Sequence, residues 1–418
     1  MKHRDMKLLN REKILGLLLN HSLLSRAELA QKAAVSPAVV SHIIRECLKE
    51  GIVCEDSEGV SRGGRKPILL SFVPDNKLVA GLVPGNTTEF AVSNLSGQLL
   101  YKEDIATKKY PTPSELAVFL KKILHEFLIR NHKSWSQLVS LGIGIPGIYD
   151  PELDLIHKMG KISSLFEWEG TKIREIFSRE FLCPVLVFDK VVAMAFGEGI
   201  LSSEDPNVNL VYLHLGRGVG AGLFLNGKIY RGSQGAAGEV GYMVCGPVDE
   251  KGPISLHDIP PLESEISLNS ILKVFREKCP NSFPNSLRQS ENDEVLILHK
   301  TFLKGDSQCE AILKPILEKA EGIAVNLVAV LNPDLLVLGG KVTEIFSEIL
   351  QERIIQRLQR SVLFSPQVKT VTLGKNEEIM CTLFFAIDDY FRRLTGNNQG
   401  LTSAFLKRYS PSSRINKL

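Results

Sequence analysis

Residues 209–230, NLVYLHLGRGVGAGLFLNGKIY, decide the fold of this chain. An apolar run leads into a glycine-rich turn, a second apolar run follows, and Asn226-Gly227 precedes a third. Asn-Gly between apolar runs is typical of a tight β-hairpin. Residues 79–105, VAGLVPGNTTEFAVSNLSGQLLYKEDI, show the same plan of strand, glycine-containing turn and strand. The two copies predict a duplicated α/β fold.

Helical and strand-like segments follow each copy, as expected of an α/β protein. Buried strands are predicted at residues 139–147, 184–189, 335–340 and 368–373. Helices are predicted at residues 114–130, 191–201, 309–331, 342–363 and 377–394.

The composition is that of a globular protein, with 44% apolar and 23% charged residues, and it argues against a disordered chain. Seven scattered cysteines form no Cys-x-x-Cys pair, which argues against a disulfide framework and for a reducing compartment. No run of 18 apolar residues occurs, so we expect no membrane span and a cytoplasmic location.

The net charge of +3 is unevenly distributed along the chain. Residues 1–72 carry 12 Lys and Arg against 8 Asp and Glu, and residues 397–418 carry four basic residues and no acid. The remainder is acidic. A basic first segment on an acidic body points weakly to a module that binds a polyanion.

Helix-capping signals in the basic first segment are typical of a helix–turn–helix. Ser25, followed three residues later by Glu28, is the capping-box pattern. Ser36-Pro37 predicts the N-cap and the first residue of the next helix, and Gly51 predicts its end.

An earlier helix over residues 11–19 and a two-stranded wing over residues 52–72 complete a winged helix–turn–helix. Small, polar and basic side chains at the start of the third helix can enter a major groove, and basic side chains at the wing tip suit phosphates or a narrow minor groove. The candidate DNA-binding residues are Ser36, Pro37, Ala38, Val39, Ser41, His42, Arg45, Arg62, Arg65 and Lys66. The alternative is a small helical module that binds another protein.

Polar residues of the body suggest a binding site. Glu239 and Glu263 can accept hydrogen bonds from a polyol, although single carboxylates are more often solvated or capping groups. Asp189 follows a buried strand, where α/β folds often place site residues, and a surface turn is the alternative. The loops at residues 84–86 and 216–220 can cradle phosphate or can simply close tight hairpins.

These motifs occur together and in order, and the chain resembles the ROK family (repressor, open reading frame, kinase), in particular its regulator branch. LSRAELAQKAAVSPAVVSHIIRECLKEGIV with GGRKP is similar to the family's winged helix–turn–helix. GIGIPGIYDP, VYLHLGRGVGAGLFLNGKIYRGSQGAAGEVGY and LNPDLLVLGG are similar to its body. The resemblance covers about residues 10–395.

The resemblance implies an α/β protein with an N-terminal winged helix–turn–helix and a two-lobe, actin-like and ribonuclease H-like body. The implied parts are a DNA-binding domain at 1–74, a first lobe at 75–190, a second lobe at 191–396 whose last helix returns to the first lobe, and a basic tail at 397–418. Active members phosphorylate sugars with ATP. Regulators bind operator DNA near sugar-use genes, usually as dimers or higher oligomers.

Departures from the family's kinase motifs favour the regulator branch. Val83 stands where active kinases carry an Asp in the first loop, and ungapped counting back from Gly197-Glu198 puts Lys190 at the catalytic Asp. A protonated Lys cannot accept the proton of a sugar hydroxyl, so we predict no enzymatic activity and no catalytic residue. A one-residue shift would restore Asp189 to that place, and an ATP-dependent sugar kinase with an appended DNA-binding domain is the alternative.

The family's zinc motif also departs from its pattern. Tyr242 stands at the motif's His, and Cys245 is all that remains of its Cys-rich run, so neither a metal nor a cofactor is expected. The resemblance implies a sugar or sugar-phosphate effector and a homodimer or homotetramer. A docking loop at residues 247–261 is a weaker, third reading. The candidate effector-binding residues are Ser164, Asp189, Glu239, Tyr242 and Glu263.

Overall fold

The structure is a computed structural model that describes residues 3–21, 23–58, 66–159, 163–203, 205, 207–244, 261–279 and 291–396. The chain forms two compact units. The first comprises Met1–Ala193, Ile200–Pro206 and Lys375–Leu418, and the second comprises Met194–Gly199 and Asn207–Gly374.

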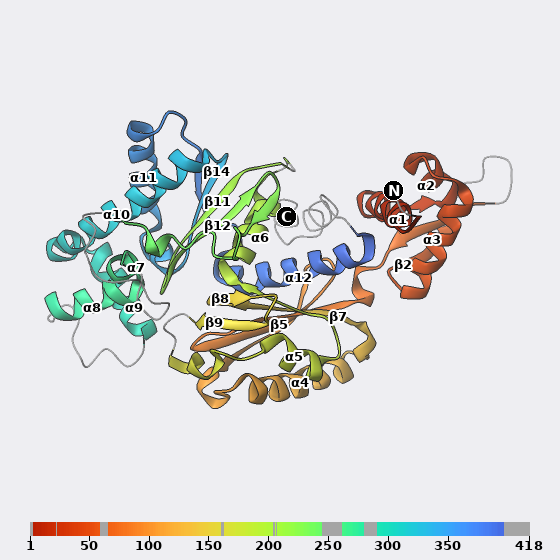
Figure 1. Ribbon diagram of the computed structural model, residues 1–418, viewed down its shortest axis with the longest axis horizontal. Coiled ribbons are helices and arrows are strands. Elements are labelled where there is room, and N and C mark those ends of the chain that lie inside the picture. Colours follow the sequence, from red (N-terminus) through yellow and green to blue (C-terminus); the bar gives the residue numbers. More distant parts are fainter. Residues whose placement is uncertain are drawn as a thin grey trace. The chain divides into compact units, whose positions relative to one another are not determined.

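The N-terminal part of the first unit is a winged helix–turn–helix (Figure 1). Strand β3 lies between β1 and β2, antiparallel to both. The core side chains of this winged helix–turn–helix are fully buried and include Ile14, Leu29, Ile43 and Leu70. The first helix begins eight residues before the predicted start, and the predicted wing tip lies mainly outside the described residues. The elements are α1 (His3–Asn20), β1 (Leu24–Ser25), α2 (Arg26–Ala33), α3 (Pro37–Glu50), β2 (Val53–Glu58) and β3 (Ile68–Phe72).

The body of the first unit is built on a sheet with strand order β10-β7-β4-β5-β6. Strands β4, β5 and β6 are antiparallel neighbours, whereas β4, β7 and β10 run parallel. The strands are β4 (Leu78–Val83), β5 (Thr87–Asn94), β6 (Leu99–Ala106), β7 (Leu138–Ile145) and β10 (Val185–Asp189). A hairpin of β8 (Gly147–Asp150) and β9 (Leu155–Met159) follows β7.

Helices cover both faces of this sheet (Figure 1). Helix α12 (Glu377–Thr395) packs on β4 and β7, and α4 (Pro113–Arg130) and α5 (Ile173–Phe181) lie on the opposite face. Glycines let α12 approach closely, because a Cβ at Gly81 or Gly142 would lie 3.0 Å from Leu383 or Ala386.

The second unit repeats this topology, with strand order β13-β12-β11-β14-β15. Strands β11, β12 and β13 are again antiparallel neighbours, whereas β11, β14 and β15 run parallel. The strands are β11 (Leu210–Leu215), β12 (Val219–Leu225), β13 (Lys228–Tyr230), β14 (Leu335–Gly339) and β15 (Gln367–Thr370). The predicted duplicated fold is therefore confirmed.

Helices complete the second unit and bury one apolar core against its sheet. They are α7 (Glu263–Ile266), α8 (Leu268–Lys278), α9 (Glu291–Leu303), α10 (Ser307–Leu331) and α11 (Lys341–Ser361). Helix α6 (Lys190–Ser202) contributes residues to both units. None of the described helices combines the length and apolarity needed to cross a bilayer.

Candidate nucleic-acid interface and effector residues

Both ends of α3 are set by local sequence. Ser36 has extended backbone, and its hydroxyl accepts a hydrogen bond from the N–H of Val39 at 3.5 Å. Pro37 occupies the first helical turn, where no N–H partner is needed. Gly51 ends the helix in the left-handed conformation, at φ +73°. The predicted helix boundaries are confirmed.

The two faces of α3 differ sharply. Val40, Ile43, Ile44 and Cys47 are buried in the module's core. The other face is exposed at Ser36, Pro37, Ala38, His42 and Arg45, and Val39 and Ser41 are partly buried. Lys49, which the sequence reasoning did not include, is also exposed and follows Arg45 by one helical turn. Its spacing from Arg45 was the signal that could have found it.

Of the predicted wing residues, Lys66 is exposed just before β3. Arg62 and Arg65 lie outside the described residues. The structure therefore describes one of the three basic wing side chains, and that one is exposed.

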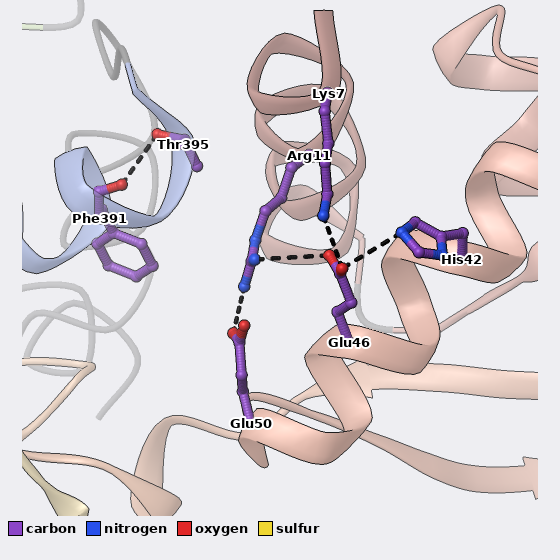
Figure 2. A network of polar contacts seen from close by, with 7 residues as sticks. All are labelled: Lys7, Arg11, His42, Glu46, Glu50, Phe391 and Thr395. Atoms are coloured by element: carbon purple, nitrogen blue, oxygen red, sulfur yellow. Dashed lines mark hydrogen bonds and ion pairs between the residues drawn. The ribbon is translucent and has the colours of Figure 1, made fainter. Parts of the chain in front are cut away.

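Two carboxylates on α3 are matched by basic side chains of α1 (Figure 2). Lys7 Nζ donates to Glu46 Oε1 at 2.6 Å, and His42 Nε2 lies 3.3 Å from the same oxygen. Arg11 donates to Glu50 and lies 4.0 Å from Glu46 Oε2. The hydrogen bond from Lys7 lowers the pKa of Glu46 below its ordinary value. These cations offset negative charge that would otherwise repel phosphates.

The winged helix–turn–helix packs on the C-terminal end of α12, within the first unit. The rings of Phe72 and Phe391 have centroids 6.1 Å apart. A Cβ on Gly396 would lie 2.7 Å from Leu8 of α1, so the chain passes this helix closely. Tyr390 is buried, and burial raises its pKa, with the negative charge of Glu50 as a second cause. The end of α12 and the winged helix–turn–helix are therefore joined by apolar contacts.

Two of the predicted effector-binding residues belong to the first unit. Asp189 ends β10 and caps α6, because its carboxylate accepts the N–H of Val191 at 2.6 Å. Its neighbour Lys190 forms an ion pair with Glu378 of α12 at 2.7 Å. Ser164 lies in the short 3-10 helix η4 (Ser163–Trp168).

The other three candidates belong to the second unit. Glu263 begins α7, and its Oε2 accepts the N–H of Val219 at 3.0 Å, beside the glycine-rich loop. Glu239 and Tyr242, both partly buried, flank and end the 3-10 helix η5 (Val240–Tyr242). The structure thus gives Asp189 and Glu263 capping and loop-supporting contacts.

The glycine-rich loop after β11 is a tight hairpin. Gly216 N–H donates to the Gly218 carbonyl at 3.0 Å, and Leu268 N–H donates to the Gly216 carbonyl at 2.8 Å. A Cβ on Gly216 would lie 2.6 Å from His214 Nε2, so a larger residue there would displace the His214 ring. This geometry supports the hairpin interpretation of the loop.

Within the described ranges, no group of three His, Cys, Asp or Glu side chains is placed to hold a metal ion. Cys245 and nearly all of the predicted docking loop lie outside those ranges, as does the basic tail from residue 397.

The fold defines a class: a winged helix–turn–helix joined to a body in which one α/β sheet topology occurs twice. The ROK family pattern matches residues 81–379, and the pattern described as winged helix-turn-helix DNA-binding matches residues 8–53. The chain belongs to the ROK family.

Similar proteins include regulators along most of the chain. A xylose repressor of Caldicellulosiruptor bescii is 27% identical over 395 residues, covering 93% of this chain and 97% of the relative. The DNA-binding transcriptional dual regulator NagC of Escherichia coli is 24% identical over 349 residues, covering 81% of this chain and 82% of the relative.

Solved structures show the same fold. A ROK family transcriptional regulator, described as a homolog of the E. coli MLC protein, matches with a TM-score of 0.72 and 18% identity, over 97% of this chain and 99% of that one. The ROK hexokinase of Thermus thermophilus matches with a TM-score of 0.59 and 21% identity, over 74% of this chain and 97% of that one.

Proposed function

We propose that the chain is a DNA-binding transcriptional repressor of sugar-metabolism genes. The main observation behind this proposal is the capped helix α3, whose exposed face presents Ala38, His42 and Arg45. Strands β2 and β3 of the wing belong to the same module. Small residues near the helix start let the backbone approach base edges, and Arg45 can read guanine or bind a phosphate. Two relatives that cover 93% and 81% of this chain are named as repressors, which supports this reading.

The proposed effector is a sugar or sugar phosphate that binds the body. Relatives named for xylose and for N-acetylglucosamine support this class of ligand. We retain Ser164, Asp189, Glu239, Tyr242 and Glu263 as the residues that contact it. Carboxylates such as Glu239 accept hydrogen bonds from sugar hydroxyls in the way this class of ligand requires.

We propose that the body has no kinase activity. The Lys190 ammonium is held by Glu378 at 2.7 Å, and an ammonium in an ion pair has no lone pair to accept a hydroxyl proton. Val83, at the end of β4, is an apolar and buried side chain that supplies no carboxylate either. The alternative, a sugar kinase with an appended DNA-binding domain, predicts ATP turnover with a sugar substrate.

The proposed functional form is a homodimer or homotetramer that binds operator DNA in the cytoplasm. A two-fold symmetric protein reads two half-sites whose separation follows its own geometry. Light scattering of the purified chain, with and without operator DNA, measures the oligomer and its stoichiometry on DNA.

A gel-shift titration on the DNA upstream of the chain's own gene tests the proposed function. Operator binding should weaken steeply with salt and should be released by one member of a panel containing D-xylose, N-acetylglucosamine and their phosphates. A coupled ATP assay on the same panel separates repressor from kinase. Turnover that is lost in Asp189→Ala would establish the kinase reading instead.

A further inference from the structure

Within the first unit, helix α12 runs from Glu378, which pairs with the neighbour of Asp189, to the winged helix–turn–helix. Glu378 stands in its first turn, and Phe391 and Thr395 stand in its last turns. At 1.5 Å of rise per residue, Glu378 and Phe391 are separated by about 20 Å along the helix axis. A shift of α12 at one end is therefore transmitted directly to the other.

The N-terminal end of α12 is held by polar contacts. Lys190 Nζ donates to Glu378 Oε1 at 2.7 Å, and Lys102 Nζ of β6 donates to Asn376 Oδ1 at 3.1 Å. Lys190 directly follows Asp189, one of the candidate effector residues. The Lys190 side chain is 18% exposed and that of Glu378 is 35% exposed, so the ion pair is partly shielded from water.

The C-terminal end of α12 is held by apolar contacts with the winged helix–turn–helix. Phe391 is fully buried and stacks at an angle against Phe72 of β3, the central strand of the wing sheet. Leu8 of α1 packs against the chain at Gly396. The position of α12 therefore bears on β3 and on α1, whose Lys7 and Arg11 pair with Glu46 and Glu50 of α3.

The sheet face under α12 carries glycines in place of larger side chains. Gly81, Gly142 and Gly144 leave backbone where side chains would otherwise interlock with the helix, and a Cβ on Gly144 would lie 2.8 Å from Thr382 Oγ1. The Thr382 hydroxyl is fully buried and has no hydrogen-bond partner among the described residues. Because the Thr382 hydroxyl has no hydrogen bond to lose, a change in this contact costs less than it would for a satisfied buried group.

We infer that the Lys190–Glu378 ion pair is the regulatory latch of this repressor. A sugar hydroxyl that competes for either partner releases the start of α12, and α12 passes the displacement to α3 through Phe391. Lys190 is thus a positioning residue for DNA binding, at the place where an active kinase would carry its base. This inference rests on the proposed function, since it specifies how the same body regulates the same operator binding.

The test is a double-mutant cycle in the full chain, read by operator affinity in fluorescence anisotropy. Lys190→Met and Glu378→Gln should each weaken binding about fivefold, because a loosened module loses preorganisation for DNA. The double variant should be no weaker than either single variant, and the exchange Lys190→Glu with Glu378→Lys should recover most of the affinity. Lys121→Met, which removes the 3.1 Å pair with Glu180 between α4 and α5, is the matched control and should leave affinity unchanged.

Hydrogen exchange of the same variants without DNA gives a second readout. Peptides of α3 and β3 should exchange faster in Lys190→Met, whereas peptides of α11 should match the wild type and so report intact folding. The inference is overturned if the effects of the two single variants add up and the charge-swapped variant recovers no affinity. It is also overturned if hydrogen exchange of α3 in Lys190→Met equals that of the wild type. Wild-type chain that shows no operator preference refutes the proposed function instead, and the exchange data then decide the α12 coupling by themselves.

Discussion

Replacing Arg11 by Met should loosen α3, because Arg11 is the cation that joins α1 to both carboxylates of that helix (Figure 2). Its side chain is only 10% exposed and donates to Glu50, and it lies 4.0 Å from Glu46. Lys7 stays on Glu46 in the variant, so the loss falls mainly on Glu50.

The magnitude follows from the exposure of the partner. A hydrogen bond to a charged group contributes about 1.5–3 kcal/mol, and the Glu50 side chain, at 36% exposed, can regain part of its hydration. In Arg11→Met the free energy of local opening of α3 should fall by about 2 kcal/mol, which corresponds to roughly 30-fold faster amide exchange.

Hydrogen exchange by mass spectrometry on the full chain measures this cost in peptides of α1 and α3. Arg11→Lys keeps the positive charge but lacks the paired N–H donors of the guanidinium, so its exchange rate should lie between those of the wild type and Arg11→Met. Arg45→Met changes an exposed Arg of α3 and serves as the control. Exchange in Arg11→Met that matches this control would refute the assigned role.

The remaining predictions concern the ends and the charged faces of α3. Gly51→Ala should destabilise the module by about 2 kcal/mol, since φ is +73° and the Cβ would collide with the Asn76 amide that donates to the Gly51 carbonyl; local exchange measures it. Ser36→Ala should cost about 0.5–1 kcal/mol in the same assay, because the cap bond is long. The pKa of Glu46 in the folded chain lies below its ordinary value of 4.5, so its ion pair stabilises the fold at pH values above 4.5, and this stability is lost as the pH falls through the folded pKa. Glu46→Gln should therefore flatten the acid limb of a circular-dichroism titration. Lys49→Ala should reduce the salt slope of DNA binding by about one without changing sequence preference.

Local signals in the sequence were sufficient for the helix ends and turns. Ser25 and Glu28 form both halves of the predicted capping box. Asn226 and Gly227 both adopt positive φ, as the tight hairpin requires. These features were predictable because each depends on residues within one turn of the chain.

Other elements had a readable signal that the sequence analysis missed. Leu268, Ile271, Leu272 and Phe275 of α8 are buried at helical spacing, and that period predicts an amphipathic helix. The two-residue strand β1 had no such signal, because it exists only through its pairing with β3, far along the chain.

The candidate site was less predictable, because its contacts join distant residues. The ion pair of Lys190 with Glu378 spans 188 positions, and the bond of Arg11 to Glu50 spans 39. The sequence shows the charges but not their partners. Likewise, Glu263 was predicted as a sugar ligand from its chemistry, and only the fold shows that it supports the loop before β12.

Footprinting of the full chain on the DNA upstream of its own gene tests the central claim most directly, with Arg45→Ala as the paired variant. We expect protection of two half-sites that weakens with salt, and in the variant the preference for one base position should relax. Protection without sequence preference, or a footprint that Arg45→Ala leaves unchanged, would contradict the assignment of α3 as the reading helix.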